Sequence, residues 1–150
     1  MSEEVVAGAD LDELIAIMAE AASAFIGGDT PRYFALMNHA DDFTLMPPTG
    51  GDVSRDTENR PERIAEMSRF FKRGECTLEV VESYASGDLV VLVVVERQHG
   101  EVGDHPPQDW SLRVTLVFRR EDGEWRLVHR HADALVHPIT FDQLAVLARG

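Results

Sequence analysis

Residues 110–133 have the sequence W-S-L-R-V-T-L-V-F-R-R-E-D-G-E-W-R-L-V-H-R-H-A-D. Apolar and polar residues alternate through both halves of this stretch, and Glu121-Asp122-Gly123 separates the halves. Because alternation with a period of two places residues i, i+2 and i+4 on one face of a strand, the stretch predicts a β-hairpin. Its second strand then carries His129, His131 and Asp133 on one face.

The length of the turn decides which residues of the first strand share that face. A two-residue turn, Asp122-Gly123, would place the two histidines beside Val114 and Leu116. A three-residue loop that includes Glu121, with Gly123 in the left-handed conformation, would instead place them beside polar residues. Glu-Asp-Gly suits the second type, because glycine then falls at the position that needs a positive φ.

The three-residue loop therefore predicts a polar face on the hairpin. Its members are Arg113, Thr115, His129, His131 and Asp133, with Trp125 and Leu127 nearer the turn. A polar set inside a sheet is costly unless it is hydrogen-bonded or hydrated, so this face predicts a pocket.

Upstream of the hairpin the pattern predicts helices first and strands afterwards. Apolar residues at helical spacing and helix-start or helix-stop residues predict helices over 10–26, 30–37 and 61–73, with Thr30 as an N-cap and a brief strand over 43–46. Residues 1–8 are expected to form a loose tail, and the polar loop Thr49–Asn59 is a candidate lid over a pocket. Strands are predicted over 76–86 and 89–99, and a short helix over 140–149. This order predicts an α+β domain spanning residues 1–150.

Composition limits the partners. The chain has 150 residues, 27 acidic against 14 basic, and a formal net charge of -13. Nucleic acids and anionic membranes bind basic surfaces, so we expect neither as a partner. Cys76 has no second cysteine to pair with, and the first residues lack the segments of a signal peptide, which predicts a cytoplasmic protein.

The apolar run Leu89–Val95 does not alternate, which predicts a strand buried on both faces. Helices can cover one face of a sheet, and we expect a second copy of the chain to cover the other. The sequence thus predicts a homodimer through the sheet.

The polar residues of the hairpin predict the chemistry of the site. His129 and His131 are candidates for general acid or base near neutral pH, Arg113 for holding an anionic oxygen, and Asp133 for orienting a histidine. The residues expected to contribute to the pocket are Tyr33, Met46, Phe70, Glu96, Trp110 and Thr115. No cofactor is expected, because the chain has no glycine-rich phosphate loop, and no metal, because His-x-His lacks evident further ligands.

The order of elements, together with L-R-V-T-L-V-F-R-R-E-D-G-E-W-R-L-V-H-R-H-A-D at its end, resembles the SnoaL-like members of the nuclear transport factor 2-like (NTF2-like) superfamily. The resemblance covers nearly the whole chain. It implies a cone-shaped α+β barrel in which three helices pack on a strongly curved antiparallel sheet, followed by a short C-terminal helix. It also implies an internal pocket and a dimer across the sheet.

The same resemblance extends to ketosteroid isomerases, polyketide cyclases, dehydratases and non-enzymatic assembly domains. In ketosteroid isomerases the base is a carboxylate just before a proline, and the corresponding pair here is Met46-Pro47. We therefore carry two hypotheses. One is a cofactor-independent enzyme that isomerises, dehydrates or cyclises a mostly apolar, oxygenated molecule by proton transfer. The other is a ligand-binding or assembly domain without chemistry.

Overall fold

The computed structural model describes residues 8–55 and 60–150. Apart from Gly8, the tail predicted for residues 1–8 lies outside the described residues, as does part of the predicted lid loop. The helices are α1 (Gly8–Ile26), α2 (Thr30–Leu36), α3 (Pro61–Phe70) and α4 (Phe141–Leu147). The strands are β1 (His39–Met46), β2 (Phe71–Ser86), β3 (Leu89–Val102), β4 (Gln108–Asp109), β5 (Leu112–Glu121) and β6 (Glu124–Asp133).

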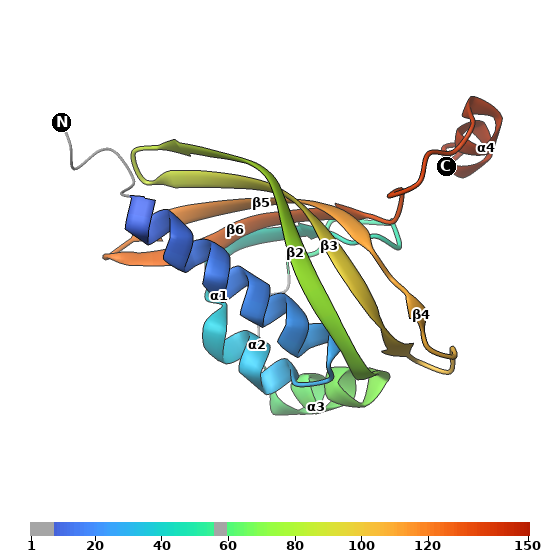
Figure 1. Ribbon diagram of the computed structural model, residues 1–150, viewed down its shortest axis with the longest axis horizontal. Helices are drawn as coiled ribbons and strands as arrows, with labels where there is room; N and C mark the ends of the chain where they lie inside the picture. Colours follow the sequence, from blue (N-terminus) through green and yellow to red (C-terminus); the bar gives the residue numbers. More distant parts are fainter. Residues whose placement is uncertain (1–7, 56–59) are drawn as a thin grey trace.

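The strands form one curved sheet with α1–α3 on one side of it (Figure 1). Its order is β1-β6-β5-β3-β2, with β4 paired to β3. The pairs β2–β3, β3–β5 and β5–β6 are antiparallel, whereas β1 runs parallel to β6. Among the described strands β1 and β2 are the edges and do not pair with each other, so the predicted α+β cone is confirmed as an open one.

The hairpin β5–β6 turns in a way that differs from the prediction. Glu121 pairs with Glu124, so the turn has two residues, and Asp122 and Gly123 both adopt positive φ, 53° and 79°. Positive φ at both positions is the type I′ geometry, whose twist matches that of the flanking strands. The expected three-residue loop is therefore wrong.

A β-bulge in β6 then changes the faces of the hairpin. Phe118 pairs with Leu127 but Val117 pairs with His129, which leaves Val128 as an extra residue. One extra residue moves every later side chain of β6 to the opposite face.

Two sets of β6 side chains are separated by this bulge. Leu127 and Ala132 face the helices and are buried, whereas His129 and His131 face away from them. Trp125 lies with Leu127 on the helix side and packs against the core, which corrects its expected place beside the histidines.

The core lies between the concave face of the sheet and the helices. It contains Leu14, Met18 and Ala22 from α1, and alternate residues of the central strands: Val90, Leu92, Val94, Val114, Leu116 and Phe118. The outward-facing neighbours on β3, Val91, Val93 and Val95, are partly exposed in the single chain. The prediction that β3 is buried on both faces therefore holds for its inner face. The outer face is apolar but partly exposed in the single chain.

The corner between α1 and α2 ties α3 to the body. Asp29, rather than the predicted Thr30, caps α2 by accepting a hydrogen bond from the backbone N–H of Arg32. Thr30 is instead fully buried, and its hydroxyl donates to the carbonyl of Ile64 at 2.7 Å. This bond ties α3 to the start of α2.

Helix α4 follows β6 and stands apart from the rest of the molecule (Figure 1). A capping box between Thr140 and Gln143 starts it, as the predicted helix requires. Its apolar side chains are exposed, with Phe141 89% exposed. In the described part of the chain no helix is both long and apolar enough to cross a membrane.

Candidate functional site

A cavity of about 350 Å³ lies between the helices and the concave face of the sheet. On the helix side it is lined by Met18, Ala22, Phe25, Ile26, Tyr33, Phe34, Arg63 and Met67. On the strand side it is lined by His39, Phe43, Leu45, Phe71, Glu96, Gln98, Leu112 and Arg130, and residues 47–49 and 54 complete it. Most of these side chains are apolar, and four of the polar ones form two pairs, Glu96 with Arg130 and Tyr33 with His39. The cavity has the size and lining of a small-molecule site.

The first polar pair is an ion pair between Glu96 of β3 and Arg130 of β6. Two hydrogen bonds of 2.7 Å each run from the guanidinium to the carboxylate oxygens, Nη1 to Oε2 and Nη2 to Oε1. The two side chains are 2% and 18% exposed, respectively. Burial lowers the pKa of Arg130, but the Glu96 charge and hydrogen bonds outweigh it and keep the pKa above its ordinary value. Arg130 is therefore held in charged form, away from water.

The second polar pair joins Tyr33 of α2 to His39 of β1. The tyrosine hydroxyl and the histidine Nε2 are 3.0 Å apart, and the tautomer of the ring decides which of them donates. Burial raises the pKa of Tyr33 to about 12. Burial and the nearby Arg130 lower the pKa of His39 to about 4. Both side chains are consequently uncharged at neutral pH.

Aromatic rings hold His39 in place. Its ring stacks on that of Phe43, with centroids 4.1 Å apart and planes at 21°, and lies edge-on to Phe34 and Tyr33. An apolar cage of this kind fixes the ring and removes water from it, which is the cause of the lowered pKa.

Cys76 adds no nucleophile to this region. Burial and the nearby Glu96 raise the pKa of its thiol to about 12, so the thiol stays protonated. A thiol, unlike a thiolate, is a weak nucleophile.

The residues predicted as catalytic come together, but on the other face of the sheet from the cavity. Arg113 pairs with Asp133 and Thr115 with His131 across the hairpin. The Arg113 guanidinium donates two hydrogen bonds of 2.9 Å to the Asp133 carboxylate and lowers the pKa of that carboxyl. The catalytic role of Arg113, Asp133 and the two histidines stays a prediction, with the four residues placed outside the cavity.

His129 has a polar partner on this outer face. Its Nδ1 lies 2.7 Å from the hydroxyl of Thr44 on β1, and its ring centroid is 6.4 Å from that of His131. The two histidines are thus neighbours on a strand surface, without a shared cavity around them.

Of the residues predicted to contribute to the pocket, Tyr33 and Glu96 line the cavity. Met46 is 40% exposed and pairs with His131 at the end of β1, on the outer side with Thr115. Trp110 donates its indole N–H to the carbonyl of Gly100 at 3.0 Å, beside the β3–β4 hairpin and away from the cavity lining.

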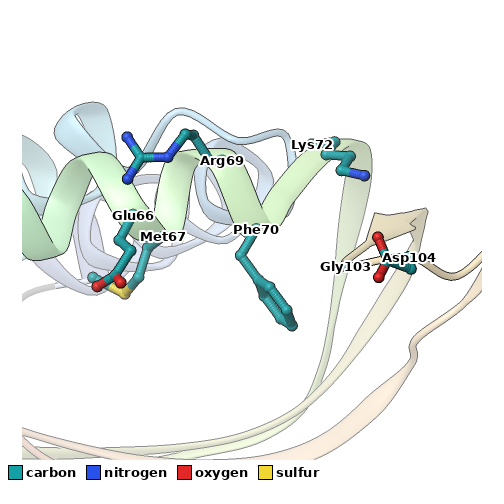
Figure 2. Close-up of a pocket in the computed structure, with 7 residues that line it drawn as sticks. All are labelled: Glu66, Met67, Arg69, Phe70, Lys72, Gly103 and Asp104. Carbon is teal, nitrogen blue, oxygen red and sulfur yellow. The ribbon is translucent and has the colours of Figure 1, made fainter.

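Phe70 lies in a different, open hollow at the end of α3 (Figure 2). Figure 2 shows its ring pointing away from the helix, with charged side chains around it. Gly103 lets the Phe70 ring lie close to the backbone, because a β-carbon there would be 3.1 Å from the ring. Phe70 therefore shapes a surface feature and does not line the cavity.

Sequence reasoning missed one member of each polar pair in the cavity, Arg130 and His39. Arg130 lies between two histidines in an alternating stretch, so its face depends on the bulge at Val128. His39 precedes the brief strand expected from Phe43, whereas β1 begins at His39 itself. The register of β1 shifts between His39 and Thr44, so the spacing of His39 and Phe43 gives no signal for their stacking. No group of three or more metal-ligating side chains is placed to hold a metal ion within residues 8–55 and 60–150.

Fold and cavity together define a small α+β protein with a chamber enclosed by helices and a curved sheet. The chain belongs to the SnoaL-like domain family, whose model matches residues 14–136. That match places it in the NTF2-like superfamily, as the sequence resemblance implied. Helix α4 lies beyond the matched residues.

Solved structures share this fold at low sequence identity. A proposed dehydratase of the NTF2-like family from Streptomyces avermitilis is 18% identical, with a TM-score of 0.63, covering 85% of this chain and 95% of its own. The calcium/calmodulin-dependent protein kinase II hub homology domain of Chlamydomonas reinhardtii is 18% identical with a TM-score of 0.63, covering 83% and 98%. An NTF2-like protein of unknown function in nutrient uptake from Rhodospirillum rubrum is 24% identical with a TM-score of 0.59, covering 82% and 98%. No curated protein matches the chain.

We expect the buried ion pair to dominate the response of stability to mutation. Glu96→Ala and Arg130→Ala should each lower the free energy of unfolding by about 3–5 kcal/mol, because each leaves a buried charge without its partner. The double variant Glu96→Leu with Arg130→Met should recover most of that loss. Urea unfolding followed by circular dichroism measures all three.

The matched control is the exposed ion pair of Arg113, which is also bidentate. Arg113→Ala should cost about 1 kcal/mol or less, because water and salt screen exposed pairs. If Glu96→Ala lowered the free energy of unfolding no more than Arg113→Ala does, the loss of Glu96 would not leave Arg130 as a buried, unpaired charge.

Proposed function

We propose that the protein binds a small, mostly apolar molecule carrying an oxygen function in the cavity between helices and sheet. The observation that carries the proposal is the cavity itself, a largely apolar chamber of about 350 Å³ that contains two buried polar pairs, Glu96–Arg130 and Tyr33–His39. Apolar walls supply affinity through burial, and a few fixed polar groups orient the ligand.

Proton transfer on that ligand is a second function, and the Tyr33–His39 pair favours it. His39 is uncharged at neutral pH, and in the tautomer whose Nε2–H donates to the Tyr33 hydroxyl its Nδ1 can accept a proton from a carbon next to a carbonyl group. Tyr33, protonated at neutral pH, can donate a hydrogen bond to the oxygen on which negative charge develops. Isomerisation, dehydration and cyclisation all include such a step.

The outer face of the sheet supports a homodimer. Val91, Val93 and Val95 lie in a row on β3, Val117 lies beside them on β5, and Tyr84 on β2 is 59% exposed. A contiguous apolar patch on a sheet face is typical of an interaction surface. A structurally similar protein from Chlamydomonas reinhardtii is itself a hub homology domain. In the dimer, His129 and His131 lie at this interface.

For ligand binding, an uncharged aromatic ketone, 2-acetonaphthone, serves as the probe. Leu112→Trp should weaken its binding at least about tenfold, because the larger ring fills space in the cavity. Leu89→Trp, the same change at a residue 45% exposed outside the cavity, should leave binding unaltered. Isothermal titration calorimetry measures both, and equal weakening by the two variants would place the probe elsewhere.

For proton transfer, the same ketone reports exchange of its methyl protons for deuterium in heavy water. His39→Asn should slow the protein-catalysed exchange by about a hundredfold, the low end for general base catalysis. His131→Asn, on the outer face, should leave the rate unchanged. Proton NMR gives the rates, and loss of exchange in His131→Asn but not in His39→Asn would return the catalytic role to the residues predicted from sequence.

For the dimer, sedimentation at micromolar concentration should give twice the chain mass of 16.7 kDa. Val93→Asp should convert it to a monomer, because a charge would be buried at the centre of the patch. Val53→Asp, the same change at an exposed loop position, should remain dimeric. A native protein that sediments as a monomer would end the dimer proposal.

A further inference from the structure

The two buried charges that line the cavity, those of Glu96 and Arg130, cancel each other. The Glu96 carboxylate meets the Arg130 guanidinium end-on, and the two hydrogen bonds of 2.7 Å use both of its oxygens. An arginine bound in this bidentate way has its charge matched by one carboxylate at close range. A ligand that enters the cavity therefore meets an ion pair with no net charge.

Two further titratable side chains of the lining, Tyr33 and His39, are uncharged at neutral pH. Burial raises the pKa of Tyr33 to about 12, and burial together with Arg130 lowers the pKa of His39 to about 4. These two groups offer a hydroxyl and a ring nitrogen for hydrogen bonding, without charge. The remaining charged residue among the described lining residues, Arg63 on α3, is exposed, and water screens its charge.

A charged ligand would upset this balance. A carboxylate placed in the cavity would bring a second negative charge close to Glu96, and an ammonium group would bring a second positive charge close to Arg130. In both cases the ligand loses its hydration shell, while the protein charge it needs is already paired. A ketone, ester, amide or hydroxyl loses little hydration and can exchange hydrogen bonds with Tyr33 or His39.

We infer that the cavity selects uncharged ligands, apolar molecules with a carbonyl or hydroxyl oxygen, and that the Glu96–Arg130 pair is the cause of this selection. The inference rests on the proposed function, because it names the chemical class of the ligand bound in that cavity. It assigns to Glu96 a second role beside the stability of the fold. Glu96 is a specificity residue that cancels the anion-binding capacity of Arg130.

The experiment compares three probes built on one ring system at pH 7.5: 2-acetonaphthone, 2-naphthoate and 2-naphthylmethylammonium. Equilibrium dialysis of the native protein should show the ketone binding at least about tenfold more tightly than either ion, because an unpaired charge resists burial. Glu96→Gln should then strengthen 2-naphthoate binding at least about tenfold and leave the ammonium ion weak, because it frees the charge of Arg130. Glu79→Gln, the same change in an exposed pair with Arg97, should keep the native order.

The outcomes separate the two proposals. If none of the probes binds, both the proposed function and the inference are overturned. If 2-naphthoate binds the native protein as tightly as the ketone does, the inference is overturned and the proposed function stands. The native comparison decides this even if Glu96→Gln is too unstable to purify. If Glu96→Gln folds and binds 2-naphthoate no better than Glu79→Gln does, Glu96 is not the specificity residue.

Discussion

The Glu96–Arg130 ion pair constrains both the curvature of the sheet and the chemistry of the cavity. The two residues belong to β3 and β6, which are separated by β5, and they align with Leu112 and Leu116 of that strand. In a flat sheet their α-carbons would be about 17 Å apart, from two strand spacings of about 4.8 Å across and four rises of about 3.4 Å along. Side-chain contacts of 2.7 Å across that span require two long side chains and a sheet that bends toward its concave face. The pair thus forms where the sheet is curved enough to hold a cavity.

The two faces of the same strands serve different purposes. On β3 the inner residues Val90, Leu92 and Val94 build the core, and Glu96 continues that row into the cavity. The outer residues Val91 and Val93 form an apolar, partly exposed row on the face of the sheet opposite α1–α3 (Figure 1). Because side chains alternate along a strand, one short sequence supplies a core, a cavity wall and an apolar outer surface.

A part of the fold or of the site can be predicted from the sequence where its pattern lies within a single element. Periodicity and capping residues locate the helices and the hairpin, because these patterns lie within the elements themselves. The parallel pairing of β1 with β6 has no local signature, and it is what brings His39 into the cavity beside Arg130. Likewise Arg130 and Glu96 are 34 residues apart in sequence, so their pairing follows from topology alone. Glu96 and Tyr33 were placed in the pocket by sequence reasoning, whereas their partners in the two polar pairs were not.

The bulge at Val128 determines which side chains of β6 face the cavity. Without the bulge, the register set by the two-residue turn would continue along β6. His129 would then pair with Leu116 and His131 with Val114, and both histidines would point into the core. Arg130 would then point outward beside Thr115, and Glu96 would be buried without a partner, at a cost of several kcal/mol. The extra residue reverses this arrangement: the arginine enters the cavity to meet Glu96, and the histidines lie on the outer face with Thr44. A bulge of this kind depends on contacts between strands, and so the same alternating sequence is compatible with either face. The energetic penalty of an unpaired Glu96 is the physical reason that favours the bulged register.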